Sequence, residues 1–286
     1  MDKKKVWYVT GASKGLGLLL VKRLLQEGYK VAATSRKLDA LVKEAGQPGD
    51  HFLPLEVDLG NEQMVQQSIE KTIAAFGKID VVVNNAGFGQ FGTLEELSDK
   101  EVRGNFEINV FALINVVRSV LPHLRSIGSG HIFNISSIAG YTGAFPGWGI
   151  YCATKFAVNG LSESLAEEVK PFGIHVTIVQ PGYFRTNFLL AGSIGLPENP
   201  IAVYENARAS QTLHQHDIDG NQQGDPEKAI RALIRVAAEP NPPVHLFLGQ
   251  DAYDMAYVKM DAVRKDLEAW KQVTVSTGFD KEQVTA

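Results

Sequence analysis

Short runs rich in apolar and β-branched residues alternate along this chain with longer segments whose apolar positions recur at helical spacing. The short runs predict seven β-strands, at residues 6–10, 30–35, 51–57, 79–85, 130–136, 174–180 and 244–249. The longer segments, such as GLLLVKRLLQEG at 17–28 and EQMVQQSIEKTIAAFG at 62–77, predict amphipathic helices. This alternation favours an α/β fold with a seven-stranded, doubly wound parallel sheet and helices on both faces.

Seven strands fit one sheet, so we place no domain boundary and expect a single domain over 1–286. Two segments depart from the alternation. Residues 186–224 show weak periodicity, and loops of this length are typical of lids, so we predict a substrate-lid insertion there. The final polar segment, 271–286, predicts a frayed tail.

The composition is that of an ordinary globular protein, with 44% hydrophobic and 21% charged residues and a net charge of −4. A weak negative charge without basic blocks argues against nucleic-acid binding. No apolar run approaches the ~20 residues of a membrane helix, so we expect no membrane span. A single cysteine, Cys152, and the lack of a signal-like apolar run indicate a cytoplasmic protein.

The first predicted strand leads directly into TGASKGLG at 10–17 and then into a helix. Glycines permit tight turning and close approach of the backbone to a pyrophosphate, while the helix N-terminus favours the anion. Position and chemistry together predict a Rossmann-like dinucleotide site with Gly11, Gly15 and Gly17 at its turn. The alternative is a plain glycine-rich turn.

The second predicted strand ends in TSRK at 34–37, where an NAD site usually carries a carboxylate for the ribose hydroxyls. Ser35 and Arg36 stand there instead, and Lys14 in the glycine loop offers a second cation. These groups suit a 2′-phosphate, so we predict NADP(H) as the cofactor. Alternatively, Arg36 and Lys37 are solvated charges at a helix start.

Tyr151 and Lys155 stand four residues apart in YCATK, so one helix face can carry both. Together with TGASKGLG, NNAG at 84–87, Asn109, NISS at 134–137 and PGYFRT at 181–186, this segment resembles the short-chain dehydrogenase/reductase family in its ordinary-length, single-domain branch. The resemblance covers most of residues 5–250 and rests on six motifs in the expected order.

The resemblance implies a catalytic set in which Tyr151 exchanges the proton, Ser137 binds the substrate oxygen, and Lys155 supports Tyr151 and binds the nicotinamide ribose. It assigns Asn109 to a helix bend and a proton-relay water. Ser137 lies fourteen residues before Tyr151, one more than usual, so Ser136 is a weaker candidate. Asn105 is a weaker candidate for the role of Asn109. The cofactor residues that we expect are Gly11, Ser13, Lys14, Gly15, Leu16, Gly17, Ser35, Arg36, Asp58, Leu59, Asn85, Ala86, Gly87, Tyr151, Lys155, Pro181, Gly182, Phe184 and Thr186.

An isolated tyrosine has a pKa of ~10 and is a poor base near neutrality. A nearby ammonium favours the phenolate, so we expect Lys155 to lower the pKa of Tyr151. Cys152 neighbours the tyrosine without a histidine partner in the sequence pattern, and we interpret it as a packing residue. His214 and His216 form a pair without a third ligand pattern, so we predict no metal site.

The expected substrate wall is apolar and favours an apolar or aromatic ketone, aldehyde or secondary alcohol. Its residues are Phe88, Phe145, Trp148, Tyr183, Phe188 and Leu189, with Ser137 at the reacting oxygen. Alternatively, several of these side chains pack the core.

Segment 108–126 is apolar around most of its helical circumference, and Ala153, Ala157, Gly160 and Ser164 form a small-residue stripe. These features predict a homodimer or homotetramer, with burial inside one chain as the alternative. The function that the residues favour is an NADPH-dependent carbonyl reductase. The alternatives are an NAD-linked alcohol or steroid-type dehydrogenase and, from another class, a cofactor-binding regulator without catalysis.

Overall fold

A computed structural model describes residues 4–189 and 192–279 of the chain, and it confirms the doubly wound α/β fold. Seven parallel strands form one sheet in the order β3-β2-β1-β4-β6-β7-β9. The strands are β1 (Val6–Val9), β2 (Lys30–Ser35), β3 (Phe52–Glu56), β4 (Val81–Asn84), β6 (Gly130–Ile135), β7 (Ile174–Pro181) and β9 (His245–Leu248). Each lies within two residues of its predicted bounds.

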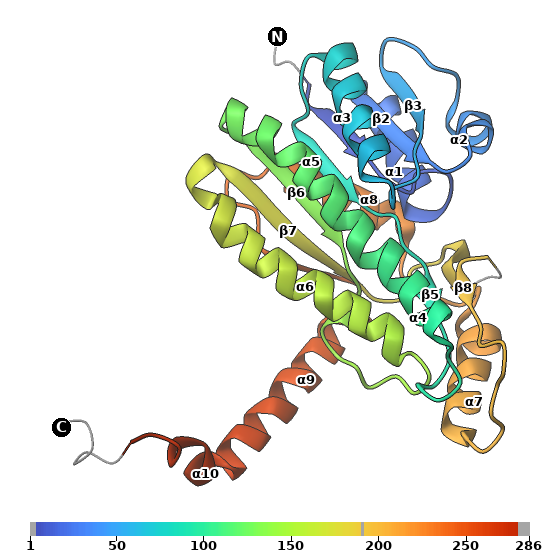
Figure 1. The fold of residues 1–286 in the computed structure, drawn as a ribbon, viewed down its shortest axis with the longest axis vertical. Helices are drawn as coiled ribbons and strands as arrows, with labels where there is room; N and C mark the ends of the chain where they lie inside the picture. The colour runs from blue at the N-terminus through green and yellow to red at the C-terminus, as the bar shows by residue number, and fades with distance from the viewer. Residues whose placement is uncertain (1–3, 190–191, 280–286) are drawn as a thin grey trace.

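Helices cover both faces of this sheet, as Figure 1 shows. Those of the main body are α1 (Gly15–Gln26), α2 (Leu38–Ala45), α3 (Glu62–Phe76), α4 (Asp99–Phe106), α5 (Ala112–Ile127), α6 (Gly149–Val169) and α8 (Pro226–Ala238). One core layer joins the sheet to α3, α5 and α6, and a second joins it to α1, α2 and α8. Both faces of the sheet are therefore covered by helices. Loops lie at the edge that the carboxyl ends of the strands form.

Local sequence explains where several helices start and stop. Asn61 caps α3 by accepting from the Met64 amide, and Gly77 closes that helix with φ at 85°. Ser98 and Glu101 form a reciprocal capping box at the start of α4. Asp225 caps α8, where Pro226 occupies the first helical position. These side chains satisfy N–H groups that a helix end leaves without partners.

One continuous helix, Asp99–Ile127, is 29 residues long and has a mean hydropathy of 1.3 in its most apolar window. By length and composition alone it could cross a membrane, so the expectation that no segment approaches this length is wrong. In the structure it packs on the sheet, with Val116, Val120 and Leu124 in the core. A π-helical turn, η1 (Glu107–Phe111), joins α4 to α5 within it.

The predicted lid contains more regular structure than its periodicity suggested. It holds the short helices η4 (Asn187–Leu189) and α7 (Glu205–Thr212) and the π-helical η5 (Leu213–Ile218). Strand β8 (Ile194–Gly195) pairs in parallel with β5 (Gly89–Gln90), which follows the fourth strand of the main sheet. This two-stranded sheet was not predicted, and it fastens the lid to the body.

After β9 the chain extends away from the sheet and its covering helices (Figure 1). Helix α9 (Gln250–Ala269) buries only Ala252 and Ala256 and projects away from the sheet (Figure 1). The predicted frayed tail is wrong at its start, because Lys271–Val275 form a further helix, α10. Residues 280–286 of that tail lie outside the described residues. Two short 3₁₀ turns, η2 (Ile138–Gly140) and η3 (Lys170–Phe172), flank α6.

Candidate active site

A cavity of about 820 Å³ opens at the carboxyl ends of the strands, where the order reverses between β1 and β4. Ligands of open α/β sheets bind at such a switch point. The loops that follow β1, β2, β3, β4, β6 and β7 all contribute to its wall, as does the lid. Its volume falls in the range of ~300–1,000 Å³ that small-molecule sites occupy.

The glycine loop lies at one end of this cavity, and its close contacts explain two of its glycines. A Cβ on Gly17 would lie 2.4 Å from Asn85 Nδ2 and 2.6 Å from the Gly11 carbonyl oxygen. A Cβ on Gly11, which has φ at +64°, would lie 2.7 Å from Ala86 Cα. The loop is therefore pressed against the end of β4, and Asn85 Nδ2 braces it by donating to the carbonyls of Thr10 and Gly11 at 3.0 Å each.

The start of α1 is shaped for an anion. Lys14 precedes the helix without a side-chain cap, so the first helical N–H groups have no capping oxygen. Gly15, with φ at +59°, leaves open space where a side chain would stand. Ser13, Lys14, Gly15 and Leu16 line the cavity. Uncapped N–H groups and a bare glycine at a cavity wall fit a dinucleotide pyrophosphate.

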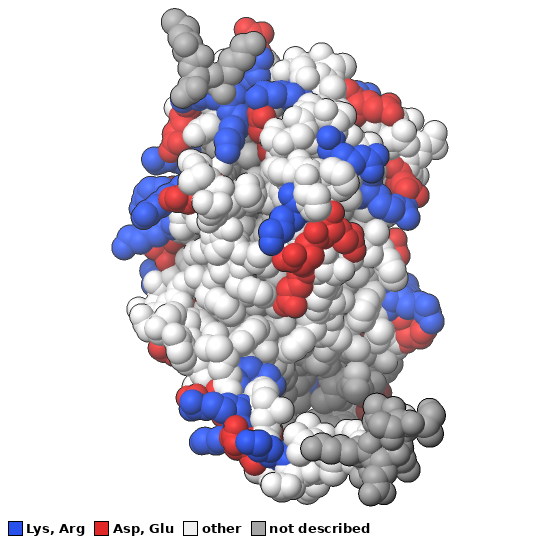
Figure 2. Space-filling model, turned by 90° about the vertical axis from the view of Figure 1, so that its left-hand side faces the viewer, with Lys and Arg blue, Asp and Glu red and all other residues white. Residues whose placement is uncertain are grey.

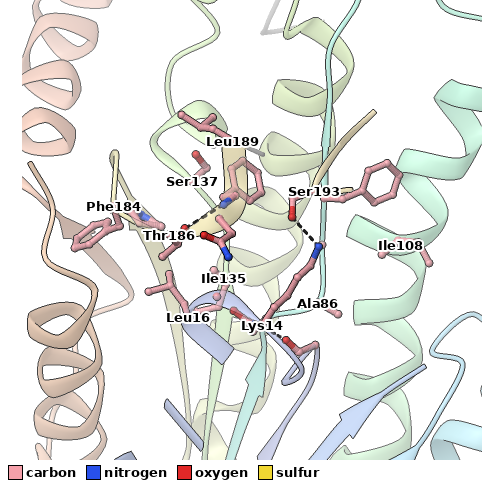
Figure 3. A pocket seen from close by; sticks show the side chains of 18 of the residues that line it. Lys14, Leu16, Ala86, Ile108, Ile135, Ser137, Phe184, Thr186, Leu189 and Ser193 are labelled. Atoms are coloured by element: carbon pink, nitrogen blue, oxygen red, sulfur yellow. Dashed lines mark hydrogen bonds between the residues drawn. The ribbon is translucent and has the colours of Figure 1, made fainter. Parts of the chain in front are cut away.

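Ser35 and Arg36 lie beside this loop, at the end of β2, and Asp58 and Leu59 follow β3. Arg36 is exposed and forms no ion pair with any residue that the structure describes. Lys14 is different, because its ammonium donates to the Gly192 carbonyl at 2.9 Å and to Ser193 Oγ at 2.7 Å (Figure 3). In this conformation Lys14 holds the lid, and its expected role as a second phosphate cation stays a prediction.

Tyr151 and Lys155 lie on the first turns of α6, with both side chains almost completely buried at the cavity wall. Ser137 begins the turn η2 after β6, and its hydroxyl accepts from the Ala139 amide at 3.1 Å. Lys155 Nζ donates to the Ile135 carbonyl at 2.8 Å and lies 5.8 Å from the Tyr151 ring centroid. Helix α6 and the end of β6 thus bring the predicted serine, tyrosine and lysine to one wall.

Burial dominates the protonation of these groups. It raises the pKa of Tyr151 above its ordinary value, and the Ser137 side chain only partly opposes the shift. Burial also lowers the pKa of Lys155 to about 8. The expectation that Lys155 lowers the pKa of Tyr151 is wrong here, because desolvation of the phenolate is the larger effect. Tyr151 therefore stays protonated at neutral pH, which is the form that a general acid needs.

Two predicted residues do not line the cavity. Gly17 packs behind the glycine loop, and Asn109 lies in the π-helical turn η1 behind Phe88. Asn109 Oδ1 accepts from the Phe88 amide at 2.9 Å, and Asn109 Nδ2 donates to the Phe88 carbonyl at 3.0 Å. Asn105 Nδ2 donates to the same carbonyl at 3.0 Å. Both asparagines therefore hold the backbone of the loop after β4, and Asn109 does so at the helix bend that we expected.

All the residues predicted for the substrate wall line the cavity: Phe88, Phe145, Trp148, Tyr183, Phe188 and Leu189. Sequence reasoning missed His214, Gln222 and Ser193 of the lid, and Ile108 of the π-helical turn. No local pattern marks these residues, because the path of the lid decides which of its side chains face inward. Among the described residues, no group of three His, Cys, Asp or Glu side chains is arranged to hold a metal ion.

The comparisons with known proteins agree with this geometry. The family model described as short chain dehydrogenase matches residues 5–191. The chain belongs to the short-chain dehydrogenase family. This dehydrogenase is 32% identical to Oxidoreductase BOA17 of Botryotinia fuckeliana over 96% of its own length and 99% of that protein. It is 36% identical to 3-ketodihydrosphingosine reductase of Bacteroides thetaiotaomicron over 84% of its own length and 86% of that protein.

Solved structures place the fold in the same family. A short-chain dehydrogenase from Streptomyces avermitilis superposes with a TM-score of 0.88 at 37% identity, covering 98% of this chain and 100% of that one. More distant neighbours were solved with either cofactor. A reductase from Brucella melitensis holds NADH; it is 25% identical, has a TM-score of 0.71 and covers 85% of this chain and 96% of its own. A short chain dehydrogenase from Burkholderia cenocepacia holds NADP; it is 27% identical, has a TM-score of 0.71 and covers 94% of this chain and 98% of its own. The chain is therefore an oxidoreductase of this family.

Proposed function

We propose that this dehydrogenase interconverts a ketone or aldehyde and its alcohol with NADP(H), acting on an apolar or aromatic substrate. The observation that carries the proposal is one continuous cavity, which has an anion-binding helix end on one side and Ser137, Tyr151 and Lys155 on the other. That arrangement can hold a dinucleotide and a carbonyl compound at the same time.

The protein supplies orientation and a proton. When bound, the nicotinamide supplies the hydride for reduction or takes it up in oxidation. Tyr151, whose phenol is protonated at neutral pH and whose pKa is raised further by burial, donates its proton to the carbonyl oxygen. Ser137 donates a hydrogen bond to the same oxygen as negative charge develops there. Lys155, fixed by its bond to the Ile135 carbonyl, presents positive charge beside the phenol.

The preference for NADP(H) is supported by Arg36. This residue lies at the cavity after β2, where an NAD site usually carries a carboxylate, and it is exposed without an ion-pair partner among the described residues. A guanidinium there favours a 2′-phosphate. The relatives bind either cofactor, so the preference rests on this residue.

The apolar or aromatic substrate is supported by the wall of aromatic side chains around Tyr151. Trp148 lies with its ring centroid 5.8 Å from that of Tyr151, and Phe188 lies at 5.9 Å on another side. The Bacteroides relative is named 3-ketodihydrosphingosine reductase, which supports a keto compound as the substrate.

The test is NADPH consumption by the purified protein over a panel of aromatic ketones, aliphatic ketones and sugar aldehydes. We expect turnover of the apolar carbonyls, and a loss of roughly 10²- to 10⁴-fold in kcat for Tyr151→Phe, because positioned proton donors contribute that much. NADPH binding should be unchanged in this variant. Normal turnover by Tyr151→Phe would contradict the mechanism.

The panel also separates the alternatives. A higher kcat/KM with NADH than with NADPH would favour an NAD-linked alcohol or steroid-type dehydrogenase of the same fold, and equal values would contradict the preference for NADP(H). NADPH binding without turnover of any carbonyl would favour a regulator without catalysis. The buried Ser137, Tyr151 and Lys155 argue against the regulator, because binding alone needs no proton donor.

We further propose a cytoplasmic homodimer or homotetramer. Phe111, at the end of η1, and Phe156, on α6, are exposed, at 50% and 43%. The stripe of Ala153, Gly160 and Ser164 is exposed on the same side of α6. Figure 2 shows that charged side chains are sparse over much of the middle of the face it presents. Small residues that allow close helix contact, next to exposed phenylalanines, suit pairing with a second copy.

A further inference from the structure

Two residues next to the catalytic tyrosine form a hydrogen-bonded pair that the proposed proton transfer does not use. Tyr183 follows β7, and His214 lies in the lid, in η5. Tyr183 Oη lies 2.9 Å from His214 Nε2, and His214 Nδ1 lies 2.7 Å from the Ser210 carbonyl oxygen. Both side chains line the cavity. The His214 ring lies 4.9 Å from Trp148, which in turn lies 5.8 Å from Tyr151 between ring centroids.

The bond to Ser210 decides where the histidine proton lies. A carbonyl oxygen only accepts, so His214 Nδ1 must carry the hydrogen. Burial lowers the pKa of His214, so the ring is neutral and Nε2 has a free lone pair. Burial also raises the pKa of Tyr183 to about 12, so the phenol keeps its proton. Tyr183 therefore donates its only hydrogen to His214.

The Tyr183 phenol oxygen can therefore only accept a further hydrogen bond. Tyr151 donates its proton to the cavity, whereas Tyr183 presents a lone pair to it. The two phenols therefore differ in hydrogen bonding, because Tyr151 is a donor and Tyr183 is an acceptor. The Trp148 ring lies beside both Tyr151 and His214.

A second acceptor lies in the neighbouring chain segment. Gln222 borders the cavity with 4% of its surface exposed. Gln222 Nε2 donates to the carboxylate oxygen Asp219 Oδ1 at 3.4 Å. A carboxylate only accepts, so the amide nitrogen faces Asp219 and the amide oxygen, Oε1, is left without this contact. No donor among the described residues reaches that buried Oε1. Gly224 donates to the Tyr183 carbonyl at 3.0 Å, so this segment runs beside Tyr183.

We propose that Tyr183, oriented by His214, is the acceptor of a polar subsite for a hydroxyl group of the substrate, with the unpartnered Gln222 oxygen in the neighbouring segment. The inference rests on the proposed function and narrows the substrate to a carbonyl compound that carries a separate hydroxyl group. The two carboxylates nearest the subsite already accept from protein groups, Asp251 from the Tyr183 amide at 2.6 Å and Asp219 from Gln222 Nε2. Neither lines the cavity, so a neutral donor fits better than an ammonium group. A buried ammonium needs a partner charge.

The test uses matched ketones that share one carbon skeleton and carry a hydroxyl, a methoxy group or hydrogen at the same position. For the unmodified enzyme we expect kcat/KM for the hydroxy ketone to exceed that for the plain ketone by about 10-fold or more, because a site built to bond a hydroxyl disfavours the analogue without it. Tyr183→Phe should remove this preference by raising KM for the hydroxy ketone alone. Tyr29→Phe, which removes a phenol that packs on Trp7, should leave it unchanged.

His214→Phe gives a readout that loss of structure would not produce. The phenylalanine keeps an aromatic ring against Trp148 but frees the Tyr183 hydrogen, so we expect activity toward the methoxy ketone to rise relative to the unmodified enzyme. Equal use of the hydroxy and plain ketones by the unmodified enzyme, or equal slowing of both by Tyr183→Phe, would overturn the subsite alone. Failure to reduce any ketone would overturn the proposed function, and the subsite with it.

Discussion

At the scale of single residues, Lys155 shows how a functional group can oppose stability. The ammonium is almost completely buried and, among the residues that the structure describes, has one hydrogen bond, to the Ile135 carbonyl, to compensate for lost hydration. Its pKa falls from 10.5 to about 8, so the folded protein holds this proton less tightly than the unfolded chain does. The buried charge therefore destabilises the fold at neutral pH, and the cost declines as pH rises from about 8 to 10.5.

Lys155→Met should consequently raise the free energy of unfolding at neutral pH while removing activity. We expect a gain on the order of 2 kcal/mol, since the pKa shift favours the apolar residue and the lost hydrogen bond offsets part of it. The gain should shrink as pH rises through 8 toward 10.5, because the wild-type protein becomes more stable there. Urea unfolding across this range measures it, with the exposed Lys265→Met as control. A gain that does not change with pH would contradict the prediction.

Arg36 belongs to the same scale, because one guanidinium is proposed to set the cofactor preference. Hydrogen bonds to charged groups contribute about 1.5–3 kcal/mol, so Arg36→Leu should raise KM for NADPH by roughly 10- to 100-fold. KM for NADH should change little. Lys37→Leu is the matched control, since it removes the neighbouring cation. If both variants weaken NADPH binding equally, Arg36 acts as a general positive charge and not as the phosphate ligand.

At the scale of elements, the lid is held by a buried ion pair. The Glu96 side chain is fully buried and accepts from Arg208 Nη2, on α7, at 2.7 and 2.9 Å. The amides of Thr93 and Ile201 each donate to it at 2.7 Å. One carboxylate of the body thereby holds two parts of the lid, and the lid supplies Tyr183's partner His214.

Breaking a buried pair by removing one partner leaves an uncompensated charge. Arg208→Met should therefore destabilise the protein by about 3 kcal/mol and raise KM for the carbonyl substrate, while the affinity for NADPH changes little. Thermal unfolding and steady-state kinetics test both parts. Arg103→Met serves as control, because its pair with Asp99 is 79% and 77% exposed and exposed pairs contribute about 0–1 kcal/mol. Unchanged KM in Arg208→Met would show that the lid does not depend on this anchor.

At the scale of the whole molecule, the assembly prediction concerns the exposed face of α6. A Cβ added at Gly160 meets no atom within 4 Å, so a side chain there fits the single chain. A closely packed partner helix would not tolerate it. Gly160→Arg should therefore convert the oligomer to a monomer, as measured by light scattering at micromolar concentration.

Gly49→Arg is the matched control, because that loop glycine also has open space around it. It should leave the oligomeric mass unchanged. A monomeric unmodified protein, or an oligomer that survives Gly160→Arg, would contradict pairing through α6. Val263→Glu on the projecting helix α9 then tests the other exposed apolar surface.

The sequence by itself determined the features that depend on spacing within one segment. Alternating strand and helix patterns specified the parallel sheet, and the four-residue spacing of Tyr151 and Lys155 placed both on one wall. The glycines at 11, 15 and 17 were predictable because they lie between the first strand and the first helix, whereas the close contacts of Gly11 and Gly17 with Ala86 and Asn85 came from the structure. Local geometry follows from local sequence, so these predictions could be made from the chain alone.

Tertiary structure decided what depends on burial and on contacts between distant segments. The direction of the Tyr151 pKa shift followed from desolvation, which no spacing reveals. Lys14 binds the lid at Gly192 and Ser193, and His214 reaches Tyr183, because the path of the lid brings these residues together. Pairing between β5 and β8 has the same origin. The sequence of a weakly periodic segment does not indicate which residues it will contact, so these contacts are known only from the folded structure.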